Sequence, residues 1–113
     1  MVVEISYNDF TKIDIRVGTI VRAEPFPEAR APAIKLWVDF GSKVGLRKSS
    51  AQITENYQLE DLIGGQVAGV VNFPAKQIGN FMSEVLILGF PDANNKVVLV
   101  RPDCDVPNGG RLY

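Results

Sequence analysis

Residues 14–53 read DIRVGTIVRAEPFPEARAPAIKLWVDFGSKVGLRKSSAQI and contain three segments whose side chains alternate with a period of two. Such alternation is typical of a β-strand with one buried face, because successive side chains point to opposite sides of a sheet. In the first segment Ile20 and Arg22 share a face, and in the second Trp37 lies opposite Leu36 and Val38. Three prolines in residues 23–32 predict a stiff connecting loop. The stretch therefore predicts three consecutive strands.

Further strands are expected in residues 66–73, 83–90 and 96–100, where apolar runs are bounded by turn residues. A short helix is expected in residues 53–65, capped by Thr54 and ended by two glycines, and a single helical turn in residues 7–10. This order is that of an OB-fold, although a β-sandwich has the same number of strands. We predict an all-β chain: a five-stranded OB-fold barrel with short flanking helices, forming one domain over residues 1–113.

The sequence contains no histidine, and Cys104 is its single cysteine. An internal disulfide and a zinc site of Cys and His ligands are therefore excluded. The common Ser–His and Cys–His catalytic arrangements are excluded as well, and no carboxylate pair or phosphate-binding glycine loop replaces them. We predict a protein that has no catalytic residues and binds no metal or cofactor.

Hydrophobic residues make up 46% of the chain and charged residues 22%, which is ordinary for a soluble globular protein. No apolar run approaches the roughly 20 residues that a membrane-spanning helix needs. The first ten residues, MVVEISYNDF, lack the basic and apolar regions of a signal peptide. We therefore expect no membrane insertion and a cytoplasmic location.

Residues 29–54 carry five basic residues and one acid, Asp39, although the net charge of the whole chain is −1. Such a run is often only a solvated surface. Beside Trp37 it also suits RNA, because cations contact phosphates and an aromatic ring can stack on a base. The candidate RNA-binding residues are Lys35, Arg47, Lys48, Lys76 and Ser83.

A second candidate surface lies in residues 70–90, VVNFPAKQIGNFMSEVLILGF. Its middle is polar, yet four large apolar residues fall within ten positions there. An apolar patch rimmed by amides and hydroxyls suits an extended polypeptide, whereas the alternative is a hairpin with an irregular loop. The candidate polypeptide-binding residues are Trp37, Ser50, Gln52, Asn72, Phe73, Gln77, Phe81 and Met82.

Four segments together resemble the CsaA branch of the tRNA-binding-domain family, a branch of export-related chaperones. They are FTKIDIRVGTIVRAEPFPEARAPAIKLWVDFG (10–41), KSSAQIT (48–54), VVNFPAKQIGNFMSEVLILGF (70–90) and VPNGGRL (106–112). The resemblance implies an OB-fold and a homodimer formed through N- and C-terminal dimerisation segments. It also implies binding of unfolded or presecretory polypeptides, with tRNA binding as the activity of the wider family.

One departure from the wider family bears on the choice between these ligands. In that family the segment that follows an asparagine contains more lysine and an arginine, in a pattern such as NLKPxKMRG. Here Pro74, Gln77 and Gly79 stand in the matching positions, and only Lys76 is charged. Fewer phosphate contacts mean weaker RNA binding. We therefore expect a non-catalytic chaperone of unfolded or presecretory polypeptides linked to protein export, and the alternative is a tRNA-binding protein that uses the same OB-fold face.

Overall fold

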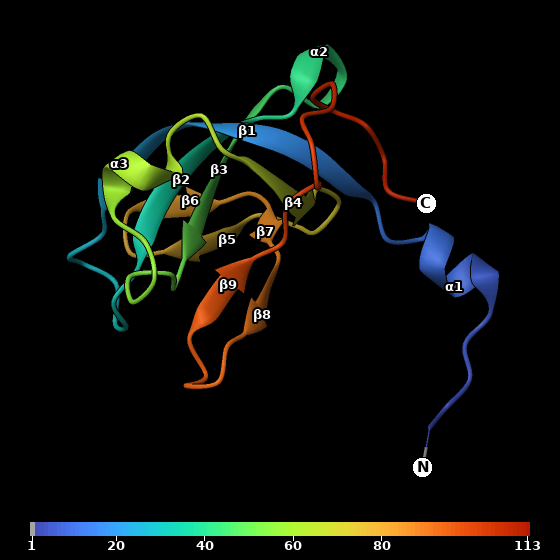
Figure 1. Cartoon of the computed structure of the whole chain (residues 1–113), viewed down its shortest axis with the longest axis horizontal. Helices are drawn as coiled ribbons and strands as arrows, with labels where there is room; N and C mark the ends of the chain where they lie inside the picture. Colours follow the sequence, from blue (N-terminus) through green and yellow to red (C-terminus); the bar gives the residue numbers. More distant parts are fainter. Residues whose placement is uncertain (1) are drawn as a thin grey trace.

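The computed structural model describes residues 2–113, and its centre is an antiparallel sheet that curls into a nearly closed barrel (Figure 1). This sheet has five strands, and neighbours in it are hydrogen-bonded. In spatial order they are β3 (Leu46–Ala51), β2 (Ile34–Asp39), β1 (Ile15–Pro25), β4 (Gln66–Val70) and β7 (Leu86–Ile87). The prediction of a five-stranded OB-fold-like barrel is confirmed, and the sandwich alternative is wrong.

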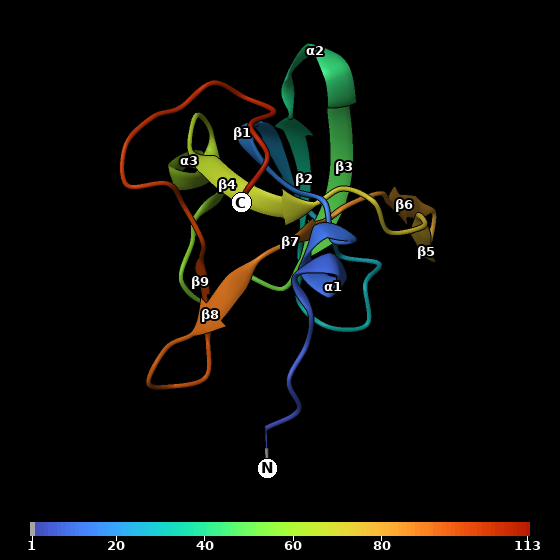
Figure 2. The ribbon, with the colours of Figure 1, turned by 90° about the vertical axis from the view of Figure 1, so that its right-hand side faces the viewer.

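Within residues 2–113, two hairpins and three short helices flank the barrel. The hairpins are β5 (Lys76–Ile78) with β6 (Phe81–Ser83), and β8 (Gly89–Pro91) with β9 (Val97–Leu99). The helices are α1 (Tyr7–Thr11), α2 (Gly41–Val44) and α3 (Leu59–Leu62). In Figures 1 and 2 the β8–β9 hairpin projects from the barrel, and the N-terminal residues extend away from it. No helix within residues 2–113 is long and apolar enough to span a membrane.

The main core lies inside the barrel, as the alternation in β2 predicts. Ile34, Leu36 and Val38 are buried, whereas the residues between them are only partly buried. β1 carries an irregularity between Ile20 and Arg22. The members of the core cluster are Ile20, Ile34, Leu36, Val38, Phe40, Ile53, Leu62, Val67, Val85 and Leu99.

The helix expected in residues 53–65 is much shorter, and the prediction of its start at Thr54 is wrong. α3 begins after Gln58. Ile53 is buried in the core, so the chain remains attached to the barrel there. Asn56 donates a hydrogen bond to the carbonyl of Val97, and the Tyr57 hydroxyl accepts one from the backbone N–H of Leu99. These contacts with the β8–β9 hairpin hold the intervening residues in a non-helical turn.

The C-terminal segment lies along the beginning of β1. Leu112 donates its backbone N–H to the carbonyl of Ile15, and Gly109 donates to that of Val17. The Asp14 carboxylate accepts a 2.7 Å hydrogen bond from Arg16, whose guanidinium also donates to the carbonyl of Gly109. The Arg16 hydrogen bond lowers the pKa of Asp14, against the opposing effect of burial. The C-terminal residues are therefore anchored to their own barrel.

Candidate binding groove and basic face

A groove of about 1180 Å³ lies on one side of the barrel. Its walls are the loop between β1 and β2 and the β5–β6 hairpin, which Figure 2 shows on the same side of the molecule. Ser50 and Gln52 line it from the end of β3, and residues 83–86 line it from the β6–β7 segment. The groove is thus built around the outer edge of the sheet.

The groove walls are mainly uncharged. Phe73 and Leu86, which are both exposed, contribute apolar surface, and Ala29, Ala33 and Ile78 add more. The charged residues that line it are two acids and two bases: Glu28, Glu84, Arg30 and Lys76. Such a lining favours neither a polyanion nor a polycation, and it suits an apolar chain with hydrogen-bonding groups.

The groove brings together six of the residues proposed from the sequence. They are Ser50, Gln52, Phe73 and Gln77 from the polypeptide set, and Lys76 and Ser83 from the RNA set. The other residues of the two sets do not line it: Trp37, Asn72, Phe81, Met82, Lys35, Arg47 and Lys48.

The expectation that Phe81 offers open apolar surface is wrong. Its side chain is 6% exposed and belongs to a second buried cluster with Phe26 and Ala33. The ring meets that of Phe26 edge-on, with centroids 5.5 Å apart, and that of Trp37 with centroids 5.8 Å apart. Phe26 comes from the proline-rich loop, so this loop folds back and provides the small second core that receives Phe81.

Asn72 also has a structural role that the sequence does not reveal. Its side-chain carbonyl accepts a hydrogen bond from the backbone N–H of Asp14, and its amide donates to the carbonyl of Lys12. The side chain therefore ties β4 to the segment that follows α1. Met82 remains 39% exposed but lies outside the groove.

A basic–aromatic face covers this second cluster; we use the term for Arg22, Lys35 and Lys48 over the rings of Phe26, Trp37 and Phe81. The Arg22 guanidinium lies 4.4 Å from the centre of the Trp37 ring. The Lys35 ammonium lies 4.9 Å from that of Phe26, and the Lys48 ammonium lies 5.2 Å from that of Phe81. These are cation–π distances.

The cations of this face differ in their partners. Arg22 forms an ion pair with Glu24. Lys35 and Lys48 form no ion pair within residues 2–113, so their charges are free to meet an anion. Arg47 is separate from the face because it points to the other side of β3, where it donates to the carbonyl of Val44.

Sequence reasoning missed Arg22 and Phe26. Unbroken alternation puts Arg22 on the same face as Ile20, which is fully buried. The irregularity in β1 shifts the register so that Arg22 lies opposite Trp37 on the outside of the sheet. No pattern in the sequence marks this shift.

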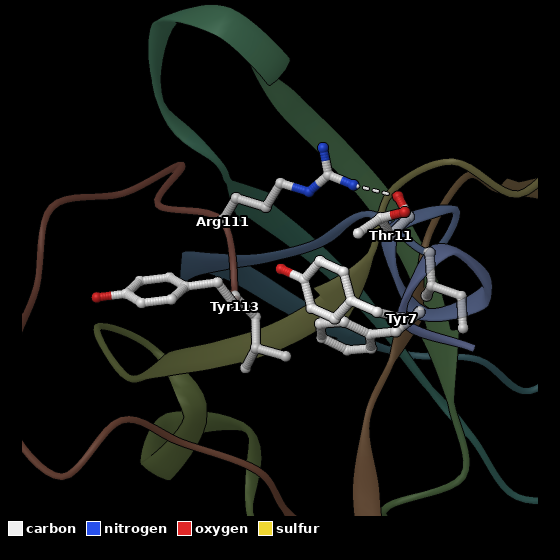
Figure 3. Close-up of a pocket in the computed structure, with 7 residues that line it drawn as sticks. Tyr7, Thr11, Arg111 and Tyr113 are labelled. Atoms are coloured by element: carbon white, nitrogen blue, oxygen red, sulfur yellow. Dashed lines mark hydrogen bonds between the residues drawn. The ribbon is translucent and has the colours of Figure 1, made fainter. Parts of the chain in front are cut away.

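A separate pocket of about 360 Å³ lies between α1 and the C-terminal segment (Figure 3). Arg111 closes one side by donating a 2.7 Å hydrogen bond to the carbonyl of Thr11. Before α1, Val2, Val3 and Ile5 in the N-terminal arm (residues 2–6) are exposed. The residues that line the pocket are Tyr7, Phe10, Thr11, Ile13, Arg111, Leu112 and Tyr113.

Comparison with known proteins places this geometry in context. The family described as a putative tRNA binding domain matches residues 15–111. The chaperone CsaA of Bacillus anthracis is 49% identical, with a TM-score of 0.90 over 98% of this chain and 100% of that one. The CsaA chaperone protein of Picrophilus torridus is also 49% identical, with a TM-score of 0.91 over 97% of this chain and 100% of that one.

A longer enzyme contains a similar segment. Methionine–tRNA ligase of Flavobacterium johnsoniae is 37% identical over 108 residues, which are 96% of this chain. The chain spans only 15% of the length of that enzyme.

Proposed function

We propose that this chain, which belongs to the tRNA-binding-domain family as a CsaA-like member, is a non-catalytic chaperone for unfolded or presecretory polypeptides on the way to export. The observation that carries the proposal is the largely uncharged groove beside β3. Similarity to two CsaA chaperones over their whole length supports it. In this role the protein acts in the cytoplasm, where polypeptides await export.

The groove offers an extended chain two kinds of contact. Phe73, which is 55% exposed, and Leu86 bury apolar side chains of the guest, at about 25 cal/mol for each Å² removed from water. Ser50, Gln52 and Gln77 supply hydroxyl and amide groups for its backbone. Because most of these contacts read no particular side chain, the groove accepts many sequences.

Dimerisation is part of the proposal. The N-terminal arm, which leads into α1, exposes apolar side chains, and a mainly apolar pocket lies between α1 and the C-terminal segment. We propose that these two terminal segments form the contact between two copies. A dimer presents two grooves, and a long unfolded chain that binds both gains avidity.

Two exposed phenylalanines provide a matched test. Phe73 lines the groove, whereas Phe90, which is 67% exposed, lies on β8 and does not line it. Phe73→Ser is expected to weaken binding of an unfolded protein about tenfold, as the loss of an aromatic anchor does. Phe90→Ser is expected to leave binding unchanged. The measurement is suppression of light scattering when a denatured protein is diluted out of denaturant. Equal effects of the two variants would contradict the proposal that the groove binds the polypeptide.

The basic–aromatic face supports a second function, binding of tRNA. Lys35 and Lys48 present charges with no ion-pair partner in residues 2–113, and they lie over aromatic rings. Phosphate contacts by such lysines make affinity fall steeply with salt. The Arg22 guanidinium already packs against the Trp37 ring. A base that stacks at this position would therefore have to share the stack with Arg22.

Competition between a labelled unfolded peptide and bulk tRNA, at two salt concentrations, separates the two functions. Lys48 and Ser50 project from the same side of β3, so the basic–aromatic face and the groove adjoin. We therefore expect tRNA to displace the peptide at low salt but not at high salt. In the absence of tRNA the peptide should remain bound at both salt concentrations. Peptide binding that is itself lost at high salt would contradict an apolar groove.

A further inference from the structure

A carboxylate stands among the cations of the basic–aromatic face. In the register of the sheet Arg22 lies opposite Trp37, which in turn lies opposite Lys48. Two residues further along β1, Glu24 lies opposite Lys35. Residues that are directly opposite in adjacent strands point to the same face of a sheet, with Cβ atoms about 5 Å apart. Glu24 therefore projects from the same surface as the three cations.

The Glu24 carboxylate binds Arg22 and leaves Lys35 unpaired. The Nε–H of Arg22 donates to the carboxylate at 2.7 Å, and a terminal nitrogen of the guanidinium donates to the same oxygen. Lys35 and Lys48 have no ion-pair partner within residues 2–113, and their ammonium groups lie over aromatic rings. In the described part of the chain, Arg22 is thus the one cation of the face whose charge a carboxylate compensates.

The pair of Arg22 and Glu24 is open to competition by a ligand. The two side chains are 60% and 38% exposed, and an exposed ion pair holds its partners only weakly. A phosphate can accept two parallel hydrogen bonds from a guanidinium. The guanidinium lies 4.4 Å from the centre of the Trp37 ring, a cation–π contact that keeps it on the face independently of Glu24. Arg22 is therefore positioned for a phosphate, and Glu24 competes with the phosphate for it.

We propose that Glu24 is a specificity-determining residue that disfavours RNA on this face and so shifts the balance of ligands toward the polypeptide. The inference rests on the proposed binding of tRNA and identifies a residue that limits it. An RNA backbone that reaches Lys35 and Lys48 gains Arg22 only by displacing Glu24, and the carboxylate itself repels phosphates. A polypeptide in the groove meets no such obstacle, because Glu24 does not line the groove.

Glu24→Gln keeps the size of the side chain and removes its charge. We expect the Kd for bulk tRNA at low salt to fall about fivefold, and the slope of log K against log salt to steepen by about one, the change for one added phosphate contact. The Kd for an unfolded apolar peptide should stay as in the wild-type protein, and an equal gain for the peptide would overturn the proposal.

Glu55→Gln is the matched control for net charge. Glu55 is exposed and forms no ion pair within residues 2–113. It precedes Asn56, whose side chain bonds the β8–β9 hairpin. The control should leave the affinity for tRNA within twofold of the wild-type value. Equal gains in Glu24→Gln and Glu55→Gln would show an effect of net charge alone and overturn the proposal.

A double-mutant cycle tests whether Glu24 acts through Arg22. In an Arg22→Gln background, Glu24→Gln should no longer steepen the salt dependence, because no guanidinium is released. Equal steepening in both backgrounds would show direct repulsion of phosphate and refute the mechanism. If the wild-type protein binds tRNA and Glu24→Gln binds it no more tightly, this inference is wrong and tRNA binding stands. If neither protein binds tRNA, the proposed tRNA binding fails and the inference fails with it.

Discussion

Replacing Phe81 by alanine tests whether this residue stabilises the fold or contacts a ligand. The ring is buried against Phe26 and Trp37. The Lys35 and Lys48 ammonium groups lie 5.4 and 5.2 Å from its centre. Loss of such a ring removes buried apolar area, two aromatic contacts and two cation–π contacts, and leaves a cavity. We expect the free energy of unfolding to fall by about 3–4 kcal/mol, within the range for large-to-small core substitutions.

Urea unfolding measures this loss directly. Trp37 is the only tryptophan, and it contacts the substituted site, so its fluorescence reports on the cluster as well as on the whole fold. With an m-value of about 1.5–2 kcal/mol/M, the expected loss moves the urea midpoint down by about 2 M. The stability of a domain is about 5–15 kcal/mol, so the variant is expected to fold at 25 °C but with little reserve.

Phe73→Ala is the matched control for Phe81→Ala, because the Phe73 ring is more than half exposed in the groove. It should cost less than about 1 kcal/mol in stability and still weaken polypeptide binding. We therefore expect Phe81→Ala to lower mainly the stability and Phe73→Ala to weaken mainly the polypeptide binding. Equal midpoints for the two variants would show that Phe81 is not a core residue, and would refute the role assigned to the second cluster.

Three further predictions concern charge, acid stability and close packing. Lys48→Glu should reduce the slope of log K against log salt for tRNA by about one, with Lys96→Glu on the β8–β9 turn as the control. The pKa of Asp14 is lowered in the folded protein, so its ionised form stabilises the fold above the unfolded pKa of about 3.9. This contribution is lost as the pH falls through the folded pKa. Asp14→Asn should therefore flatten the acid limb of a curve of stability against pH. In Gly18→Ala the new Cβ would lie 2.7 Å from Val38 and 2.8 Å from Phe40, so thermal unfolding should show a loss of about 1–3 kcal/mol.

The period-two patterns predicted the barrel because one buried face repeats along β2. Leu36 and Val38 are buried as expected, and the pattern in β3 also placed Ser49 and Ser50 on opposite faces correctly. The pattern records only the burial of successive residues along a regular strand. It therefore failed at Arg22, where an irregularity in β1 reverses the face.

The candidate site was less predictable because it depends on contacts between segments far apart in the sequence. Phe81 was expected on the surface because its neighbours are polar, but Phe26 and Ala33 from the β1–β2 connection pack against it and bury it. Asn72 was expected in the groove, yet its side-chain amide is hydrogen-bonded to the backbone of Lys12 and Asp14. Tertiary pairing of this kind leaves no period in the local sequence.

The two proposed ligands meet on β3, and this arrangement has a consequence for how the protein would work. Lys48 contributes its ammonium group to the basic–aromatic face, and its backbone N–H donates to the carboxylate of Glu84, which lines the groove. A guest chain in the groove would therefore lie beside the lysines that a phosphate would contact. Occupation of one site crowds the other, and at low salt RNA also neutralises the charge that covers Phe81. Binding of the polypeptide and binding of RNA would therefore exclude each other because both involve β3, without any change in the fold of the barrel.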